Sequence, residues 1–333
     1  MPAVQNGRLE SRAATSIDSA IAAVGSGSEP VWVGWAVPLA EHRGSLCTQW
    51  SPDLAGVSIA RIEPETPAAA VPSPQPVRLE VGTHLVVLVR LVAGRVERLR
   101  TLDDECPIDA GGRAVHWLTG ISPAESVRYL DALIRTSAST LASGQRVALA
   151  AVPAIALHRD AVADATLDRL IAEDSAEAVA RQAATWMGST RGARGFETLT
   201  AALGRATDPQ RRRLLVTALG QSRQPKTADA LLTLARTDRD AAIRAEAVHW
   251  YARQASSGVL PNVMGIITGD NDDVVRRRAV SSLGFIAADS GIPALIQLAR
   301  TGPSPVIRKE AVSTLARTTD ARARAFLEEL VAR

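Results

Sequence analysis

Charged side chains recur at a fixed spacing in the C-terminal half of this 333-residue sequence. Arginine returns every 32 residues, and three of the four arginines have an aspartate four residues before them. Guanidinium groups bind carboxylates and phosphates through paired hydrogen bonds. The residues therefore suit a structural Asp–Arg ladder, which the shared period favours, or an anion-binding stripe. The predicted ladder consists of Asp208, Arg212, Asp240, Arg244, Asp272, Arg276 and Arg308.

No pattern in the sequence indicates catalysis or a metal centre. The chain has five histidines, and none is followed by glutamate or grouped with cysteines at the spacing of metal ligands. No G-x-S-x-G elbow, P-loop or Cys-x-x-Cys pair occurs. We therefore predict no catalytic residue, no cofactor and no metal.

The two cysteines, Cys47 and Cys106, leave two interpretations open. They are either separate thiols or a disulfide that staples the N-terminal domain, which would be typical of an oxidising compartment. The first residues, MPAVQNGRLESRA, lack the apolar segment of a signal peptide. We expect a cytoplasmic protein by default, and an extracytoplasmic one if a leader was removed and the cysteines are bonded.

The arginines belong to a longer repeated motif, represented by VRRRAVSSLG at 275–284. Related segments begin at residues 147, 179, 211, 243 and 307, so the spacing of 32 is unbroken. A constant period of this size predicts a solenoid, in which each unit packs on its neighbours. The repeats are expected to start near residues 144, 176, 208, 240, 272 and 304.

Each repeat reads as two short helices. Positions zero, four and eight of the motif are mostly apolar and form one stripe at helical spacing. Asp208, Asp240, Asp272 and Ser304 precede the first helix by the distance expected for N-caps. A second apolar stripe begins at Leu167 and recurs through Leu327. The predicted architecture of residues 143–333 is a right-handed α-solenoid of six helical hairpins.

Residues 1–136 have a different pattern and predict a small α+β domain with an antiparallel sheet and flanking helices. An amphipathic helix is expected over 7–24, and a strand follows from Val31. Residues 84–92 and 95–102 are two apolar-rich runs around Ala93-Gly94, which indicates a hairpin. A short strand is expected within 57–62, and the proline-rich stretch 63–77 is expected to be a loop. Ser122 and Pro123 then mark the start of a helix that ends near residue 136.

Composition excludes some classes and leaves others open. Hydrophobic residues make up 46% and charged residues 22%, which indicates a folded chain, and no apolar run has the length of a membrane span. Residues 143–333 carry 26 Lys+Arg against 20 Asp+Glu, whereas residues 1–142 carry 12 against 15. The repeats can therefore meet acidic partners, although the acidic residues are interspersed with the basic ones and no uninterrupted basic face appears.

The repeated Asp, β-branched residue, Arg, Ala and Leu-Gly, at a period near 32, resemble the HEAT family. More narrowly, they are similar to the HEAT-like repeats named after phycobilisome lyases. The resemblance covers about residues 143–333 and implies a scaffold that binds another protein on an extended surface, without chemistry of its own. Nucleic-acid binding, as in HEAT-like glycosylases acting on alkylated DNA, is the first alternative. A lyase-type enzyme, or an accessory subunit of one, is the second.

Six residues are candidates for contact with a partner. Two tryptophans share one motif position two repeats apart, where they are either packed at the edge of the core or exposed as interface anchors. The others are basic residues expected to point outward, where a solvated face is the usual outcome. The candidates are Trp186, Arg213, Trp250, Arg277, Arg278 and Lys309.

Overall fold

The computed structural model divides the chain into two compact units, Met1–Trp186 and Met187–Arg333. It describes residues 1–25, 27, 29–41, 46–47, 60–63, 82–137, 142–172, 176–254 and 258–332. Most of the proline-rich stretch 63–77, and the first part of the strand expected within 57–62, lie outside these residues. The sequence predicts a division between 136 and 143, whereas the unit boundary falls inside the helix α5 (Glu177–Thr190).

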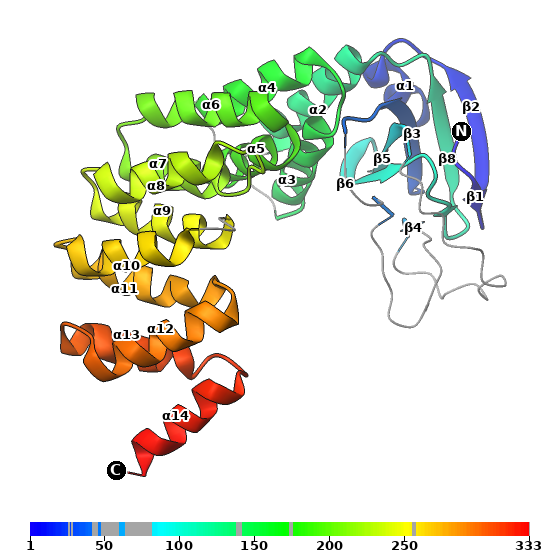
Figure 1. Cartoon of the computed structure of the whole chain (residues 1–333). Helices are drawn as coiled ribbons and strands as arrows, with labels where there is room; N and C mark the ends of the chain where they lie inside the picture. The colour runs from blue at the N-terminus through cyan, green and yellow to red at the C-terminus, as the bar shows by residue number, and fades with distance from the viewer. Residues whose placement is uncertain are drawn as a thin grey trace. The chain divides into compact units, whose positions relative to one another are not determined.

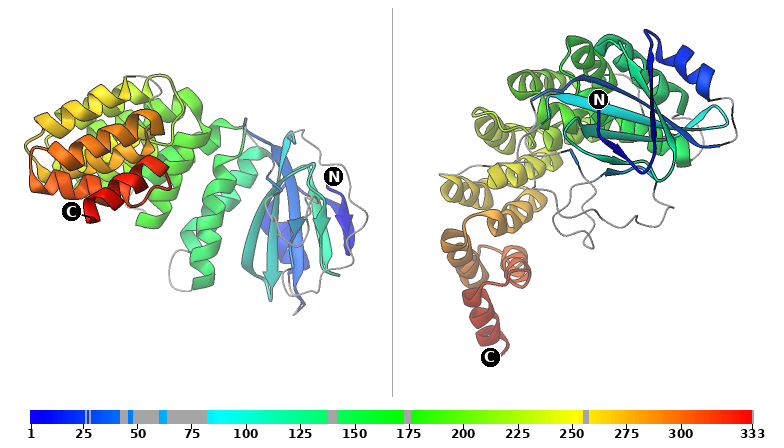
Figure 2. Two further views of the ribbon diagram at one scale, coloured as in Figure 1. Left: turned by 60° about the horizontal axis from the view of Figure 1, so that its bottom comes forward. Right: turned by 90° about the vertical axis from the view of Figure 1, so that its right-hand side faces the viewer.

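A five-stranded sheet forms the centre of the first unit (Figures 1 and 2). The predicted hairpin is confirmed, because its two strands pair antiparallel around Ala93 and Gly94, both with positive φ. The neighbouring pair β3 and β5 is also antiparallel, but β2 with β8 and β8 with β3 are parallel, so the sheet is mixed and not antiparallel as predicted. The strand order is β2 (Arg8–Ala13), β8 (Ala114–Thr119), β3 (Val31–Pro38), β5 (His84–Val92) and β6 (Arg95–Asp103).

The helix predicted over 7–24 is wrong in its first half. Residues 8–13 form the edge strand β2, and the helix α1 (Ile17–Val24) begins only after Ser16. Ser16 is the N-cap and accepts a hydrogen bond from the Ser19 amide at 3.3 Å. Leu9 and Ala13 match a helical spacing, but the backbone of this segment instead pairs with β8 along six residues. Long-range pairing has overridden the local pattern.

A second, three-stranded sheet packs on one face of the first. Its strands are all parallel, in the order β1 (Val4–Gln5), β7 (Ile108–Asp109) and β4 (Ala60–Arg61). Between the sheets lies an apolar core that includes Trp32, Trp117 and Cys106. Cys106 and Cys47 form a disulfide, which is the second of the two arrangements that the sequence left open. The disulfide links Cys47 to this core.

The other face of the large sheet is covered by helices. The helix α2 (Pro123–Ser137) starts as predicted, with Ser122 accepting a hydrogen bond from the Glu125 amide at 3.1 Å. Inside, Trp35 donates its indole N–H to Ser126 at 2.7 Å, and the Ser126 hydroxyl lies 2.8 Å from Nε2 of the buried His158. This buried polar chain ties β3, α2 and the end of α3 (Ala142–Ala156) together. The first repeat is thus part of the same compact unit as the sheets.

Twelve helices follow α2 in the described residues, and they form six consecutive pairs, as the repeat spacing predicts. Figure 1 shows the pairs in order along the chain. No helix among the described residues is long and apolar enough to cross a membrane. The pairs are α3 and α4 (Ala161–Ala172), α5 and α6 (Gly192–Arg205), α7 (Pro209–Leu219) and α8 (Thr227–Thr237), α9 (Ala241–Gln254) and α10 (Val259–Gly269), α11 (Asp273–Ser282) and α12 (Ala288–Thr301), and α13 (Pro305–Leu315) and α14 (Ala321–Val331).

The predicted apolar stripes form the core of these pairs. In the first helices, positions four and eight of the motif are buried in all six repeats, and position zero is buried in every repeat except the third, where it is Arg211. In the second helices, the stripe from Leu167 to Leu295 is fully buried, and Leu327 in the last helix is half-buried. The period of the sequence therefore reflects one packing arrangement repeated along the chain.

Candidate interaction surface

The arginine column is buried as predicted, but its carboxylate partners are different residues. Arg244 forms two hydrogen bonds to Asp270, from Nε at 2.7 Å and from Nη2 at 3.0 Å. Arg212 pairs with Asp238, the equivalent aspartate one repeat earlier, through Nη2. Asp238 and Asp270 end the second helices of the two repeats. Each arginine thus connects the start of its own repeat to the junction with the next one.

Asp208, Asp240 and Asp272, which the sequence assigns to the ladder, cap helices instead. Their carboxylates accept hydrogen bonds from backbone amides of the following first turn, for example Asp272 from Val274 at 2.8 Å. This confirms Asp208, Asp240 and Asp272 as N-caps. The arginines Arg212 and Arg244 pair instead with Asp238 and Asp270, which lie two residues before the N-caps Asp240 and Asp272. The donors nearest to an N-cap carboxylate are the backbone amides in the first turn of the same helix. The carboxylate therefore binds these amides and not the more distant arginine.

The ladder ends before the last repeat. Arg276 pairs with Asp273 of its own helix, because Gly302 stands where a carboxylate would be needed. Arg308 donates to the Gly302 carbonyl at 2.8 Å. All four arginines therefore have a partner within the chain, and the anion-binding stripe stays an untested alternative.

Glu246, in the middle of α9, organises the surface beside the ladder. It is 8% exposed and accepts hydrogen bonds from Trp250 Nε1 at 2.8 Å and from Thr217 Oγ1 at 3.0 Å. Two of the predicted outward arginines also converge on it: Arg213 Nε lies 3.5 Å and Arg278 Nη2 lies 4.0 Å from its carboxylate. A single buried carboxylate thus positions side chains from α7, α9 and α11.

Trp250 is fixed on its other side by a close backbone approach. Its indole ring lies over Gly220, where an added Cβ would come within 2.2 Å of the ring. Only glycine allows this contact, which explains the small residue at this motif position. Together with the hydrogen bond to Glu246, the contact holds the indole in one orientation.

Three further side chains complete a cluster that we call the Trp250 surface, consisting of His249, Trp250, Arg253 and Phe285. The Arg253 guanidinium lies 5.4 Å from the Trp250 ring centre and 4.9 Å from that of Phe285. His249 packs edge-on against both rings, at 5.6 Å and 5.0 Å. Phe285 is 50% exposed, although it is apolar. The pKa of His249 is lowered to about 4, first by burial and then by Arg278, so the imidazole is neutral near pH 7.

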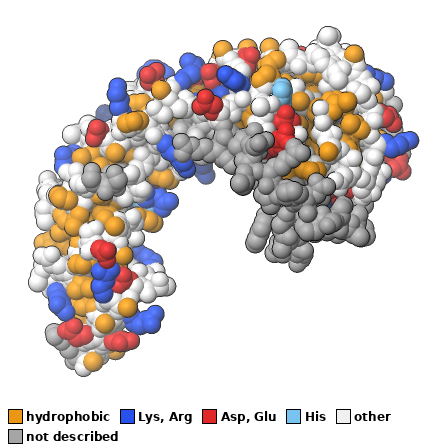
Figure 3. All heavy atoms as spheres, turned by 45° about the vertical axis from the view of Figure 1, so that its right-hand side comes forward, with side chains coloured by type: hydrophobic (Ala, Val, Ile, Leu, Met, Phe, Trp, Pro, Cys, Tyr) orange, Lys and Arg blue, Asp and Glu red, His pale blue; other side chains and the backbone are white. Residues whose placement is uncertain are grey.

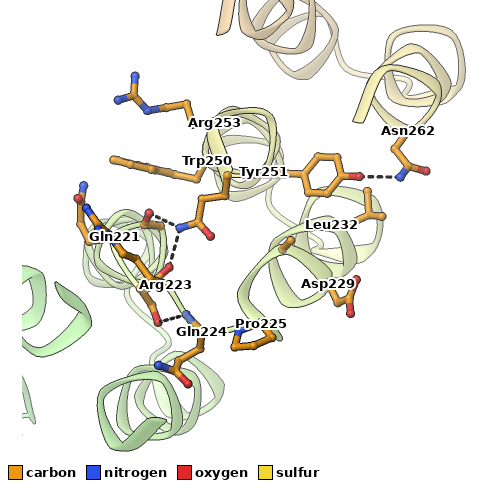
Figure 4. A pocket seen from close by; sticks show the side chains of 14 residues that line it. Gln221, Arg223, Gln224, Pro225, Asp229, Leu232, Trp250, Tyr251, Arg253 and Asn262 are labelled. Carbon is orange, nitrogen blue, oxygen red and sulfur yellow. Dashed lines mark hydrogen bonds between the residues drawn. The ribbon is translucent and has the colours of Figure 1, made fainter. Parts of the chain in front are cut away.

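A polar cavity of about 700 Å³ adjoins the Trp250 surface. Its walls come from the α7–α8 loop and from α8, α9 and α10. Figure 4 shows Arg253 and Trp250 on one side of α9, while Tyr251 points toward Asn262, whose amide donates to its hydroxyl at 2.6 Å. Gln254 donates to the carbonyls of Gly220 and Ser222, which fixes the loop that forms the rim. The site is thus a preformed hollow beside an exposed aromatic cluster.

The remaining candidate residues are placed as follows. Arg213, Arg277 and Arg278 line a smaller hollow of about 310 Å³ on the first helices, together with Glu246 and Glu310. Lys309 is exposed on α13, outside both hollows, and Trp186 is half-buried at the end of the first unit. Figure 3 shows Lys and Arg side chains interspersed with hydrophobic ones on the visible face of the repeats. Within the described residues no group of three His, Cys, Asp or Glu side chains could hold a metal ion.

Arg253 and Phe285 were not candidates in the sequence analysis. They lie 32 residues apart, Arg253 in α9 and Phe285 in the 3₁₀ helix η1 (Leu283–Phe285) that follows α11, so only the packing of these two repeats brings them together. A sequence signal existed, because 32 is the repeat period and residues one period apart lie next to each other in a solenoid.

Comparison with known proteins identifies the repeats but not a reaction. Residues 163–252 and 260–333 match the family model of HEAT repeats. Among solved structures, the chain is similar to human deoxyhypusine hydroxylase in complex with glycerol, with 14% identity and a TM-score of 0.31, over 61% of this chain and 90% of that one. No curated protein matches the chain. The match is to HEAT repeats in general, and the narrower similarity to the phycobilisome-lyase type stays a prediction.

Proposed function

The chain belongs to the HEAT-repeat family through residues 163–333, and on this premise we propose that it is a non-enzymatic scaffold that binds a partner protein at the Trp250 surface. HEAT repeats commonly mediate protein interactions. The observation that carries the choice of surface is the half-exposed Phe285 stacked against Arg253, which itself stacks on Trp250. Tryptophan and arginine are the residue types most enriched where binding energy is concentrated.

The rigidity of the surface supports the same proposal. The hydrogen bond to Glu246 and the contact with Gly220 fix the Trp250 side chain in the unbound protein. Binding would therefore cost little side-chain conformational entropy at this residue. Arg253 is exposed and stacked between two rings, which leaves its outer donors available to acceptors on a partner.

Charge indicates the kind of partner. Residues 187–333 carry 22 Lys+Arg against 14 Asp+Glu, a surplus of eight positive charges. On α11, Arg278 is close enough to His249 to lower its pKa, and Arg277 and Arg278 line the smaller hollow. We therefore propose an acidic protein surface with at least one apolar side chain that covers Phe285. The same surplus of positive charge makes nucleic acid the second candidate.

The test uses the full-length protein as bait, with bound material quantified by mass spectrometry and by absorbance at the nucleic-acid maximum. Phe285→Ser and Arg253→Ala are the test variants, because both side chains are exposed and their loss leaves the helix core intact. Val306→Ser is the matched control, since Val306 is 38% exposed and lines neither hollow. Unfolding temperatures confirm that all variants are folded.

We expect one set of partner proteins to be lost about tenfold or more with both test variants and retained with Val306→Ser, as for a loss of about 1.4 kcal/mol or more. Retention of the same proteins by all variants would show that the Trp250 surface is not the binding site. Nucleic acid that is released steeply as salt rises would instead support the second candidate.

A further inference from the structure

Two arginines on the edge strand of the large sheet each have a buried nitrogen without a hydrogen-bond partner among the described residues. Arg98 and Arg100 lie two residues apart on β6, so both side chains project from the same face of the strand. Arg98 Nη1 and Arg100 Nε are buried, and neither atom has a hydrogen-bond partner among the described residues. Burial and the charge of Arg98 together lower the pKa of Arg100. Among the described residues, no carboxylate pairs with Arg98 or Arg100.

A neighbouring arginine, Arg90, is paired with carboxylates of the same unit, unlike Arg98 and Arg100. Arg90, which faces Arg98 across the β5–β6 ladder, donates to Glu63 and to Glu97, each at 2.7 Å. The carboxylates beside this face are therefore already engaged by Arg90. A half-buried cation without a counter-charge is costly, so a bound anion would stabilise Arg98 and Arg100.

Arg100 opens onto a cavity of about 210 Å³ between β6, β4 and α3. Arg61 of β4 lines the same cavity and lies 4.0 Å from Asp109, whose carboxylate already accepts from Asn6 at 3.1 Å and from the Gly111 amide at 2.9 Å. The rest of the lining is mainly apolar, with Ala150 and Pro153 from α3. The cavity thus combines a cationic wall with an apolar one.

We propose that this cavity binds a small oxyanion, a carboxylate or phosphate group on a small ligand, between Arg100 and Arg61, with Arg98 adding positive charge. A guanidinium group matches either anion with two parallel hydrogen bonds. The size of the cavity admits one small group and excludes a polymer. The site lies in the first compact unit and is independent of the function proposed for the repeats.

The test is the unfolding temperature of the full-length protein in sodium phosphate and in sodium acetate, each compared with sodium chloride at the same ionic strength. The variants are Arg100→Gln and, as the matched control, Arg95→Gln, since Arg95 is an exposed arginine on the same strand. Binding to the folded state alone raises the unfolding temperature in proportion to the logarithm of anion concentration.

Two opposite changes are expected in Arg100→Gln. In chloride, its unfolding temperature should equal or exceed that of the wild type, because an unpaired charge is removed. The rise caused by phosphate or acetate should disappear, while Arg95→Gln keeps it in full. Whichever anion acts at the lower concentration identifies the preferred group. If Arg100→Gln fails to fold, Arg98→Gln takes its place, with at least a fivefold loss in anion affinity expected by calorimetry.

Either of two results would overturn the proposal. An equal response of wild type and the arginine variants would show a general ion effect or an adventitious ion only. No response of the wild type to either anion at 20-fold excess over a typical millimolar affinity would show that the cavity binds no oxyanion.

Discussion

The ion pair between Arg244 and Asp270 should be one of the strongest single links between repeats. Two hydrogen bonds of 2.7 Å and 3.0 Å join the side chains, which are only 16% and 10% exposed. Hydrogen bonds to charged groups contribute about 1.5–3 kcal/mol. We therefore expect a coupling energy of about 2 kcal/mol between these two residues.

The perturbation is a double-mutant cycle of Arg244→Gln and Asp270→Asn, followed by urea unfolding of the full-length protein. Asparagine is chosen because its side-chain oxygen can still accept from the Asp272 amide, now at 2.9 Å, so mainly the charge is removed. The control cycle is Arg276→Gln with Asp273→Asn. That pair lies within one helix and is 24% and 52% exposed, so its coupling should be about 0.3–0.5 kcal/mol.

Acid provides a second check on the same pair. Burial alone would raise the pKa of Asp270, but the hydrogen bonds from Arg244 and from the Asp272 amide outweigh it and lower this pKa. The unfolded chain then binds the proton more tightly, so the stabilisation is present above the unfolded pKa of about 3.9 and is lost as pH falls below it. The stability difference between wild type and Asp270→Asn should shrink in that range.

If the coupling energy between Arg244 and Asp270 were no larger than that of the control pair, the predicted strong link between repeats would be refuted. It would also fail if Asp270→Asn were as destabilising at pH 3 as at pH 7.

Three further predictions concern other parts of the chain. Leu295→Ala should cost about 2–5 kcal/mol, because the side chain is fully buried in α12, and an unchanged unfolding temperature would contradict this. Reduction of the disulfide between Cys47 and Cys106, 59 residues apart, should cost about 4 kcal/mol, and two titratable thiols in unfolded, unreduced protein would exclude the bond. His249 has a pKa lowered to about 4, so wild type should lose stability relative to His249→Gln as pH falls from about 6.5 to 4; histidine NMR titration tests this directly.

The repeats could be predicted from the sequence because their core positions are filled in the same way each time. Apolar residues at Ile243, Ala247 and Tyr251 have counterparts one period away, and all three are buried. The N-caps could also be predicted from the sequence, because a cap depends on residues within one helical turn. Local and periodic features are those that a single sequence reveals.

What the sequence did not reveal depends on distance in the chain. The partner of Arg244 lies 26 residues away, and two aspartates near the junction, Asp270 and Asp272, are equally plausible from spacing alone. The Asp-x-Asp pattern at 238–240 and 270–272 was visible in the sequence. Helix geometry decides that the first aspartate of each pattern pairs with arginine and the second caps the following helix. The strand β2 depends on pairing with β8, more than 100 residues later, which no local pattern encodes.

Gly302 leaves one junction of the array without the arginine–aspartate link. Without a carboxylate there, the interface before the last hairpin lacks the link that Asp238 and Asp270 provide at two earlier junctions. The stability of a solenoid is close to a sum of repeat and neighbour contributions, so opening should begin at its least stabilised end. Backbone amides of α13 and α14 should therefore exchange with deuterium earlier than those of α9. Local opening of α13 and α14 would then leave the Trp250 surface intact.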